Sequence, residues 1–295
     1  MPRHLEWPTL ALLTLTYALW AAATLWLSAI SLPLAVLVAA LAIAQHSSLQ
    51  HEMMHGHPFR DPRWNTALVF PALTLVIPYL RFRDTHLAHH RDSELTDPYD
   101  DPESNYLDAA VWDRLPRPLR GLLTLNNTLA GRMAFGPLIG TVTFLGSEIR
   151  SAPNDPRVLR GWLWHIPMVL PVIAWVAWSP MPVWAYLVAC YLALSLLRIR
   201  TFLEHQAHEH SRARSVIIED RGPLALLFLN NNFHVVHHMH PRVPWYRLPL
   251  LYRENADRYR RVNGGYVFRS YAQVFRRYFL ARKDPVAHPL WRRSV

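Results

Sequence analysis

Long uncharged stretches dominate the pattern of apolar and polar positions along the chain. Residues 7–51 contain no Asp, Glu, Lys or Arg, and residues 161–197 contain none either. Helices at a water surface need a polar face, so soluble domains rarely leave such stretches uncharged. About 20 apolar residues are needed to cross a bilayer. The segments that approach this length are 8–30, 33–50, 161–179 and 181–199. The pattern predicts an all-α integral membrane protein with four transmembrane helices.

Two short turns join these segments in pairs. The turns, at residues 28–33 and 179–182, carry no charged residue, so each pair is predicted to form a hairpin. Every Lys and Arg lies outside the uncharged parts of the hairpins, and the positive-inside rule makes that side cytoplasmic. We therefore expect one membrane domain, residues 1–295, with cytoplasmic segments at about 51–160 and 200–295.

Two further apolar runs are interrupted by prolines or polar residues. Residues 66–80 form a 15-residue run with two prolines, and residues 121–146 include two asparagines and one arginine. A single crossing by the first run would put His51 and His86 on opposite faces of the membrane. Both runs are therefore expected to be interfacial or re-entrant helices, with a short true span as the alternative for 66–80. After Arg198 the chain is soluble-like, which favours a cytoplasmic helical cap.

Charge and composition narrow the choice of partners. The formal net charge is +10, and Lys283 is the only lysine among 31 Lys and Arg residues. A basic balance suits nucleic acid, an anionic membrane surface or an acidic protein. Because the basic residues flank apolar spans, we expect no nucleic-acid partner. Cys190 is the only cysteine, which excludes a disulfide within one chain. The first apolar segment has no evident small-residue cleavage site, so it is predicted to be a retained helix.

The candidate chemistry lies in the histidines, of which the chain has 17. Nine of them fall into three clusters and one isolated position. The first cluster is His51 and His55, the second is His86, His89 and His90, and the third is His234, His237 and His238; His205 stands alone. Side chains three or four residues apart share a helix face. Each cluster is therefore predicted to present its imidazoles on one side of a helix.

Nine imidazoles are too many ligands for one metal ion. Imidazole suits Zn, Cu, Fe and Ni, whereas a structural zinc site takes four ligands, usually with Cys among them. Nine imidazoles fit two metals with four or five ligands each. The alternative, interfacial or core histidines, is disfavoured because three clusters at helical spacing fall on one predicted face. Glu52, inside the first cluster, is interpreted as orienting an imidazole N–H, with a ligand role as the alternative. The histidines left unassigned are His4, His46, His57, His165, His208, His210, His240 and His288.

The motifs HxxxH, HxxHH and a late HxxHH resemble the three histidine boxes of the integral-membrane fatty acid desaturase superfamily. This superfamily includes desaturases, hydroxylases and carotenoid ketolases. Segments 51–56, 97–104 and 237–249 are also similar to bacterial members, and the resemblance covers about residues 10–255. It implies two iron ions held almost wholly by histidine, with a further ligand before the last box, here His205. Some members place an Asn one turn before that histidine, where this chain has Thr201.

The resemblance also implies a reaction. It predicts an O2-dependent, non-haem di-iron oxidoreductase, with an acyl-lipid desaturase that introduces a C=C bond as the first hypothesis. A hydroxylase, a carotenoid ketolase or a desaturase of a small specialised metabolite are alternatives within the superfamily. A non-enzymatic membrane metal-binding protein is the alternative from another class. No catalytic residue beyond the metal ligands is predicted.

The expected electron donor and substrate complete the prediction. It contains no haem domain of the cytochrome b5 type, no CxxC pairs and no Gly-rich nucleotide fingerprint. A separate electron donor is therefore expected, either ferredoxin-, rubredoxin- or cytochrome b5-like, together with a reductase. The substrate is expected to be a lipid or acyl chain that enters from the bilayer. The predicted location is a bacterial inner membrane, with the metal site on the cytoplasmic face.

Overall fold

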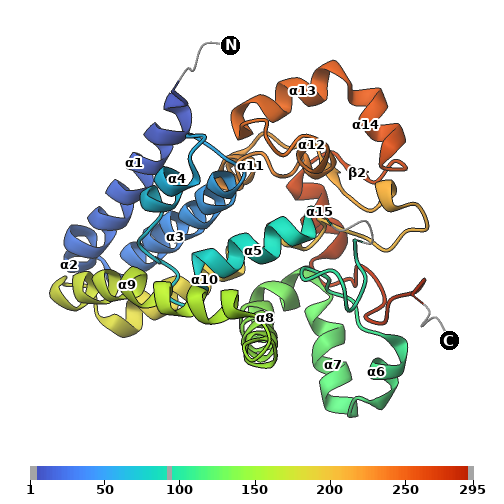
Figure 1. The fold of residues 1–295 in the computed structure, drawn as a ribbon, viewed down its shortest axis with the longest axis horizontal. Helices are drawn as coiled ribbons and strands as arrows, with labels where there is room; N and C mark the ends of the chain where they lie inside the picture. Colours follow the sequence, from blue (N-terminus) through green and yellow to red (C-terminus); the bar gives the residue numbers. More distant parts are fainter. Residues whose placement is uncertain (1–4, 92–94, 292–295) are drawn as a thin grey trace. The chain divides into compact units, whose positions relative to one another are not determined.

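Helices make up most of the computed structural model, which describes residues 5–91 and 95–291 (Figure 1). The helices are α1 (Trp7–Ala22), the π-helical η1 (Ala23–Leu27), α2 (Ser28–Ile30), α3 (Leu32–Met54), α4 (Pro62–Leu68), α5 (Tyr79–His89), α6 (Ala109–Arg114), α7 (Arg117–Asn126), α8 (Leu129–Ser151), α9 (Pro156–Trp178), α10 (Val183–Thr201), the 3-10 helix η2 (Ser211–Ala213), α11 (Pro223–Leu227), α12 (His234–Met239), the 3-10 helix η3 (Trp245–Arg247), α13 (Leu248–Glu254), α14 (Ala256–Val262) and α15 (Tyr271–Tyr278). Strands β1 (Ile217–Ile218) and β2 (Val267–Phe268) form a small parallel pair, with Ile217 opposite Val267. The all-α class therefore holds apart from these two short strands.

The chain divides into two compact units. The first, here called the apolar unit, comprises Met1–Asp84 and Pro137–Leu197. The second, here called the histidine-rich unit, comprises Thr85–Gly136 and Arg198–Val295. Each unit is built from segments that are far apart in the sequence.

Five helical segments within residues 5–91 and 95–291 are long and apolar enough to cross a membrane. They are Trp7–Ile30, Leu32–Met54, Leu129–Ser151, Pro156–Trp178 and Val183–Thr201. Four of them match the predicted spans to within a few residues at most ends. The fifth, α8, covers most of the run 121–146, so the count of four spans is not confirmed. The run looked interrupted because Arg132 lies inside it, but α8 continues through this residue as one 23-residue helix.

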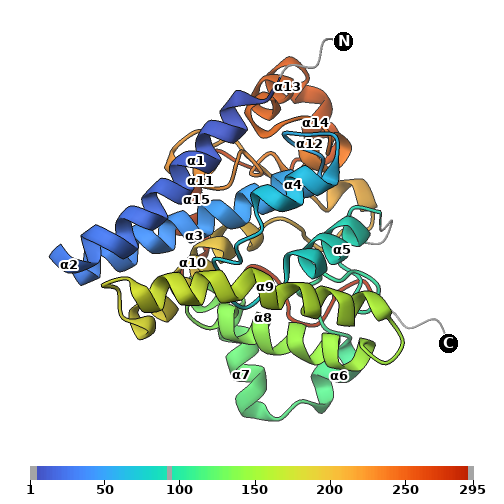
Figure 2. The same cartoon turned by 60° about the vertical axis from the view of Figure 1, so that its left-hand side comes forward.

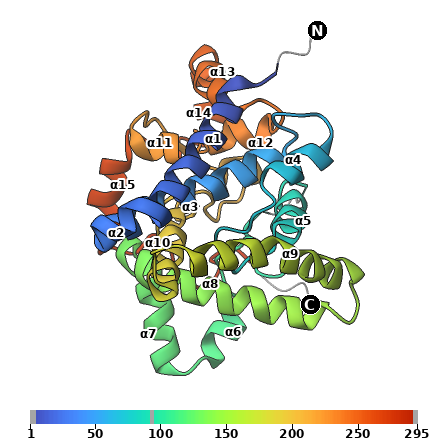
Figure 3. The ribbon, with the colours of Figure 1, turned by 90° about the vertical axis from the view of Figure 1, so that its left-hand side faces the viewer.

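The first hairpin of the apolar unit is formed by α1 and α3. The chain stays helical through η1 and α2 and then breaks at Ser31, whose backbone is extended (φ −150°, ψ 99°). Pro33 lies in the first turn of α3, where backbone N–H groups have no partner within the helix. The N–H that proline lacks therefore costs no hydrogen bond there. Figures 2 and 3 show α1 and α3 lying alongside one another. The uncharged turn thus reverses the chain, as predicted.

Most of the run 66–80, from residue 69 to residue 78, enters the apolar unit without forming a helix. Between α4 and α5 the backbone is irregular, and its polar groups are bonded by the spans. The Leu73 carbonyl accepts from the Tyr186 hydroxyl at 2.8 Å, and the Leu75 carbonyl lies 3.0 Å from His165 Nε2. Irregular backbone at membrane depth is tolerated where protein buries it. The expectation of a helix over the whole run was therefore wrong, and its re-entrant character stays a prediction.

A hydrophobic core supports the third cluster in the histidine-rich unit. This core comprises Ile217, Phe233, Val235, Val236, Leu248, Tyr252 and Tyr259. Val235 and Val236 belong to it, whereas His234, His237 and His238 lie at the other positions of α12. Figure 3 shows α12 near α13 and α14, which supply Tyr252 and Tyr259. The two valines thus anchor the helix that carries the third cluster.

The C-terminal segment after α15 bonds to loops of the same unit. The Leu107 N–H donates to the Val286 carbonyl at 2.9 Å, and the His288 N–H donates to the Leu107 carbonyl at 2.8 Å. Lys283 N–H donates to the Asn127 carbonyl at 3.0 Å. These bonds fix the end of the loop 95–107, which carries two acidic side chains of the candidate site.

Candidate metal centre

Four predicted ligands gather in the histidine-rich unit. His89 ends α5, His205 follows α10, and His234 and His238 lie on α12. One ring nitrogen from each lies within 4.8 Å of the others. Side chains from three separate parts of the chain therefore converge on one point, and His89 lies 116 residues before His205.

The converging atoms are Nε2 nitrogens. His89 Nε2 lies 2.9 Å from His205 Nε2, which lies 3.1 Å from His234 Nε2. His238 Nε2 lies 3.1 Å from His234 Nε2. Two imidazole nitrogens, each about 2.1 Å from one ion and at right angles to each other, are about 3 Å apart. The spacing therefore suits donors that share one metal ion.

Side-chain oxygens lie beside the Nδ1 nitrogens of His89 and His205. His89 Nδ1 lies 2.7 Å from Asp101 Oδ1, and His205 Nδ1 lies 3.3 Å from Ser215 Oγ. A proton on His89 Nδ1, directed at a carboxylate, leaves the Nε2 lone pair for a cation. Asp101 is itself held, because the Thr96 N–H donates to its Oδ2 at 2.8 Å.

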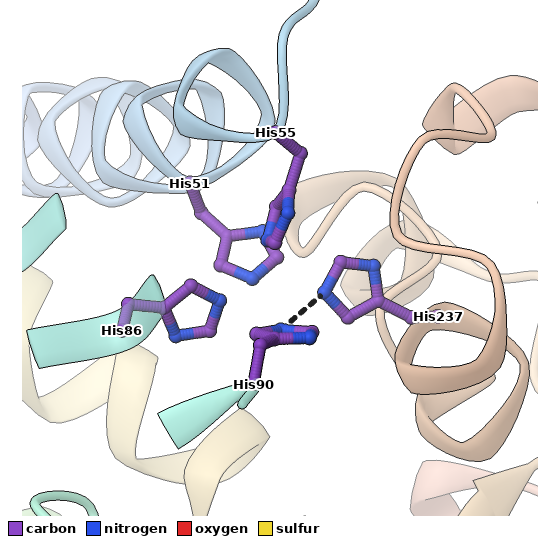
Figure 4. A group of neighbouring side chains, drawn as sticks. All are labelled: His51, His55, His86, His90 and His237. Atoms are coloured by element: carbon purple, nitrogen blue, oxygen red, sulfur yellow. Dashed lines mark hydrogen bonds between the residues drawn. The ribbon is translucent and has the colours of Figure 1, made fainter. Parts of the chain in front are cut away.

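A second set in the same unit consists of His86, His90 and His237. His237 Nε2 lies 3.1 Å from His90 Nε2, and the His86 and His90 rings are 4.6 Å apart in a T-shaped arrangement. Figure 4 shows these three rings turned toward one another. His86 Nδ1 lies 2.8 Å from Glu103 Oε1, which repeats the carboxylate–imidazole contact of the first set.

His51 and His55 form a pair in the apolar unit. His51 lies in the last turn of α3, and His55 is the residue at which the helix ends. Their ring centroids are 5.0 Å apart, and Figure 4 shows both rings extending from this end of the helix. They therefore share one face, as their spacing predicts.

Burial keeps four of these imidazoles neutral. Burial and the charges of neighbouring histidines hold the pKa values of His205, His234 and His238 well below their ordinary range. The same causes lower the pKa of His90 to about 3. A neutral imidazole is the form that binds a metal ion, so at neutral pH these side chains are ready donors.

His89 differs because carboxylates surround it. Burial, the largest influence, lowers its pKa, but Glu103, Asp101 and Glu204 together outweigh burial and raise the pKa to about 9. Without a cation the ring therefore carries two protons at neutral pH. A metal ion at Nε2 would replace one of them, and the other would stay on Nδ1 beside Asp101.

Asp101 and Glu103 were not predicted as site residues. Both lie in the segment 97–104, which is similar to bacterial members of the desaturase superfamily. Although burial raises the pKa of Glu103, the charges of His86 and His89 outweigh it and hold the pKa well below its ordinary value. The two acids follow the second cluster in a loop, where no helical period reveals which way they face.

Glu52 belongs to a third group, in the apolar unit. Its carboxylate lies with Glu6 and His57, and His57 Nδ1 lies 2.8 Å from Glu6 Oε1. The predicted role of Glu52 as an orienter of an imidazole N–H within the first cluster stays a prediction. His57, one of the unassigned histidines, has an acidic partner.

The other unassigned histidines have separate surroundings, and His4 lies outside the described residues. His46 Nε2 lies 3.0 Å from the Tyr17 hydroxyl, and His288 Nε2 lies 3.1 Å from Thr96 Oγ1. His208 and His210 form a ring pair with centroids 5.7 Å apart. In the part of the chain that the structure describes, none of these four belongs to the two convergent sets.

Comparison with known proteins adds one finding to this geometry. The family model described as fatty acid desaturase matches residues 24–270, which include all nine predicted ligands. No curated protein matches the sequence. The model covers well over half of the chain, and its range begins within the first helical segment and ends just before α15. The chain therefore belongs to the fatty acid desaturase family.

Proposed function

We propose that this protein is an O2-dependent di-iron membrane oxidoreductase that introduces a C=C bond into an acyl chain. The proposal rests chiefly on the convergence of four Nε2 atoms, from His89, His205, His234 and His238, in a member of the desaturase family. A separate donor protein and a reductase supply the electrons. The whole chain acts as one domain in a bacterial inner membrane, with the metal centre on the cytoplasmic face.

We assign one iron to each set of imidazoles. His89, His205, His234 and His238 hold one ion. His86, His90 and His237 hold the other. His51 and His55, at the end of α3, are further proposed iron ligands. The donor chemistry supports iron, because neutral imidazole is a good ligand for iron. It disfavours a structural zinc site, which usually includes cysteine.

The bound irons would supply the activation of O2 needed to remove hydrogen from an unactivated C–H bond. The chain's own residues do the rest. Asp101 and Glu103 hold imidazole N–H groups and so fix the direction of each Nε2 lone pair. Burial of His86, His89 and His234, each at most 2% exposed, keeps water from the ligand side. The apolar helices hold the protein in the bilayer, from which a lipid chain can reach the centre.

The test is product analysis with the full chain in lipid vesicles. A reductase, an electron carrier, NAD(P)H, O2 and lipids of known acyl composition are added, and the products are identified by mass spectrometry. The proposal expects loss of two hydrogens from an acyl chain, and loss of that activity in His234→Ala but not in the exposed His210→Ala. An alcohol or ketone product would instead assign a hydroxylase or ketolase. An iron-loaded wild type that yields none of these products would overturn the proposal.

A further inference from the structure

Asn231 links a predicted metal ligand to a buried carboxyl group. Its Oδ1 lies 3.2 Å from His234 Nδ1, and its Nδ2 donates to Glu204 Oε1 at 3.0 Å. Asn231 is 3% exposed and Glu204 is 6% exposed. Neither side chain is a predicted ligand, and both belong to the histidine-rich unit. The contact is therefore an internal connection, shielded from water, between the third cluster and the segment before His205.

The two ends of the Asn231 amide are not interchangeable here. An amide has a donor end and an acceptor end, and only the NH2 end can bond to a carboxylate. Glu204 therefore turns the NH2 end toward itself and the oxygen toward His234. Because the amide oxygen accepts, His234 must carry its proton on Nδ1, and its Nε2 keeps a free lone pair. Arg200 Nε lies 3.0 Å from Glu204 Oε1. The contacts therefore run from Arg200 through Glu204 and Asn231 to His234.

The backbone before α12 is shaped to deliver this amide. Leu229 and Asn230 both have left-handed backbone conformations, with φ of 52° and 55°, which is uncommon for a leucine. The Asn230 side chain donates to the Trp245 carbonyl at 3.1 Å and so secures the turn. The turn places Asn231 three residues before His234. Asn231 does not cap α12, whose N-cap residue is Phe233.

We propose that Asn231 is a positioning residue that sets the tautomer of His234, and that Glu204 sets the orientation of Asn231. The inference rests on the proposed function, because it assumes that His234 Nε2 binds a metal ion. Contacts of this kind, from a second layer of residues around a metal, are worth about 10–100-fold in metal affinity. The relay differs from the Asp101–His89 contact, because a neutral amide needs a further group to fix its orientation.

The test exchanges the amide group of Asn231 and the carboxyl group of Glu204 between the two positions. Full-length N231L, N231D, E204Q and N231D/E204Q are compared with wild type for iron and Co(II) affinity by chelator competition, and for the visible spectrum of the Co(II) forms. N231L removes the acceptor, and N231D sets two carboxylates against each other. In the double variant the amide at position 204 donates to the carboxylate at position 231, which still accepts from His234. We expect about a 10–100-fold loss of affinity for one of two ions in N231L, a loss in N231D, and recovery in the double variant.

Asn232→Leu is the matched control. This neighbouring buried amide donates to the Ile218 carbonyl at 2.6 Å and to the Asp220 carbonyl at 3.0 Å. Its loss should lower the unfolding temperature without changing the affinity or spectrum of Co(II). Wild-type affinity in folded N231L, or a double variant no better than N231D, would overturn the inference. A wild type that binds Co(II) but never iron would contradict the proposed function, and the Co(II) comparison would still decide the role of Asn231.

Discussion

The side chains of His89 and Asp101 meet at 2.7 Å in the interior of the histidine-rich unit, with 0% and 1% of their surfaces exposed. This contact joins the end of α5 to a loop twelve residues further along the chain. The carboxylate keeps the proton of His89 on Nδ1 and so presents Nε2 to the other three imidazoles. Asp101 therefore shapes the candidate centre without being a ligand.

Replacing Asp101 should weaken metal binding without unfolding the protein. In Asp101→Asn the amide loses the charge that favours Nδ1–H, and the affinity for one ion should fall about 10–100-fold. Iron content after chelator competition measures this. The exposed Asp113→Asn is the control and should behave as wild type. Equal iron retention by the two variants would contradict the assigned role.

The C-terminal segment is expected to stabilise the position of His205. Lys283 Nζ donates to the His205 carbonyl and lies 3.3 Å from Asp284 Oδ2, while Asp284 accepts from the Tyr106 hydroxyl. Lys283→Met should leave this carbonyl without its buried donor and lower iron retention by about tenfold, at the weaker end of such effects. Chelator competition is again the measurement.

Arg282→Met offers the comparison for Lys283, since the neighbouring Arg282 side chain is exposed. This variant should retain wild-type iron. If both variants lose iron to the same degree, the C-terminal segment acts through general stability and not through His205.

A buried ion pair should dominate the stability of the α8–α9 region. Arg81 donates to Glu148 through Nε at 2.8 Å and through its terminal NH2 group at 2.9 Å, and Trp162 Nε1 donates to the same carboxylate at 3.1 Å. Removing one partner leaves a buried charge, which costs about 3–5 kcal/mol. Glu148→Ala should therefore lower the thermal unfolding temperature in detergent much more than Glu254→Ala on α13. Equal unfolding temperatures would show that the pair contributes little.

Topology can be tested by cysteine labelling from outside the cell. In a Cys190→Ser background, the proposed two-hairpin arrangement expects single cysteines at Ser31 and Ser179 to react with an impermeant reagent. A cysteine at Asn154, between α8 and α9, should stay protected. Labelling at Asn154 would mean that α8 crosses the membrane, and the proposed single cytoplasmic face would be wrong.

The sequence predicted those parts of the fold that leave a local pattern. The spans 8–30 and 161–179 stand out because they contain no charge, and their helices begin and end within one residue of the predicted limits except at Pro156, five residues before the predicted start. The run 121–146 was predicted as an interfacial or re-entrant helix and not as a span, because it contains two asparagines and Arg132; α8, which covers most of it, is long and apolar enough to span. A charge close to a helix end changes the sequence pattern much more than it changes the backbone.

In the candidate site, too, only the features that leave a local sequence pattern could be predicted. Spacing predicted that His86, His89 and His90 share a helix face, because they lie three and four residues apart. The partners of these rings could not be predicted in this way. Asp101 and Asn231 reach the imidazoles from loops, and their contacts depend on tertiary structure that has no sequence period.

Metal content of the purified protein tests the central claim most directly. Elemental analysis of active, aerobically purified protein should find about two irons per chain, because the two sets of imidazoles exceed what one ion can bind. His→Ala changes at His86, His205 or His237 should each lower the iron content, whereas the exposed His210→Ala should leave it unchanged. One zinc and no iron in active protein, or equal iron in all four variants, would contradict the account.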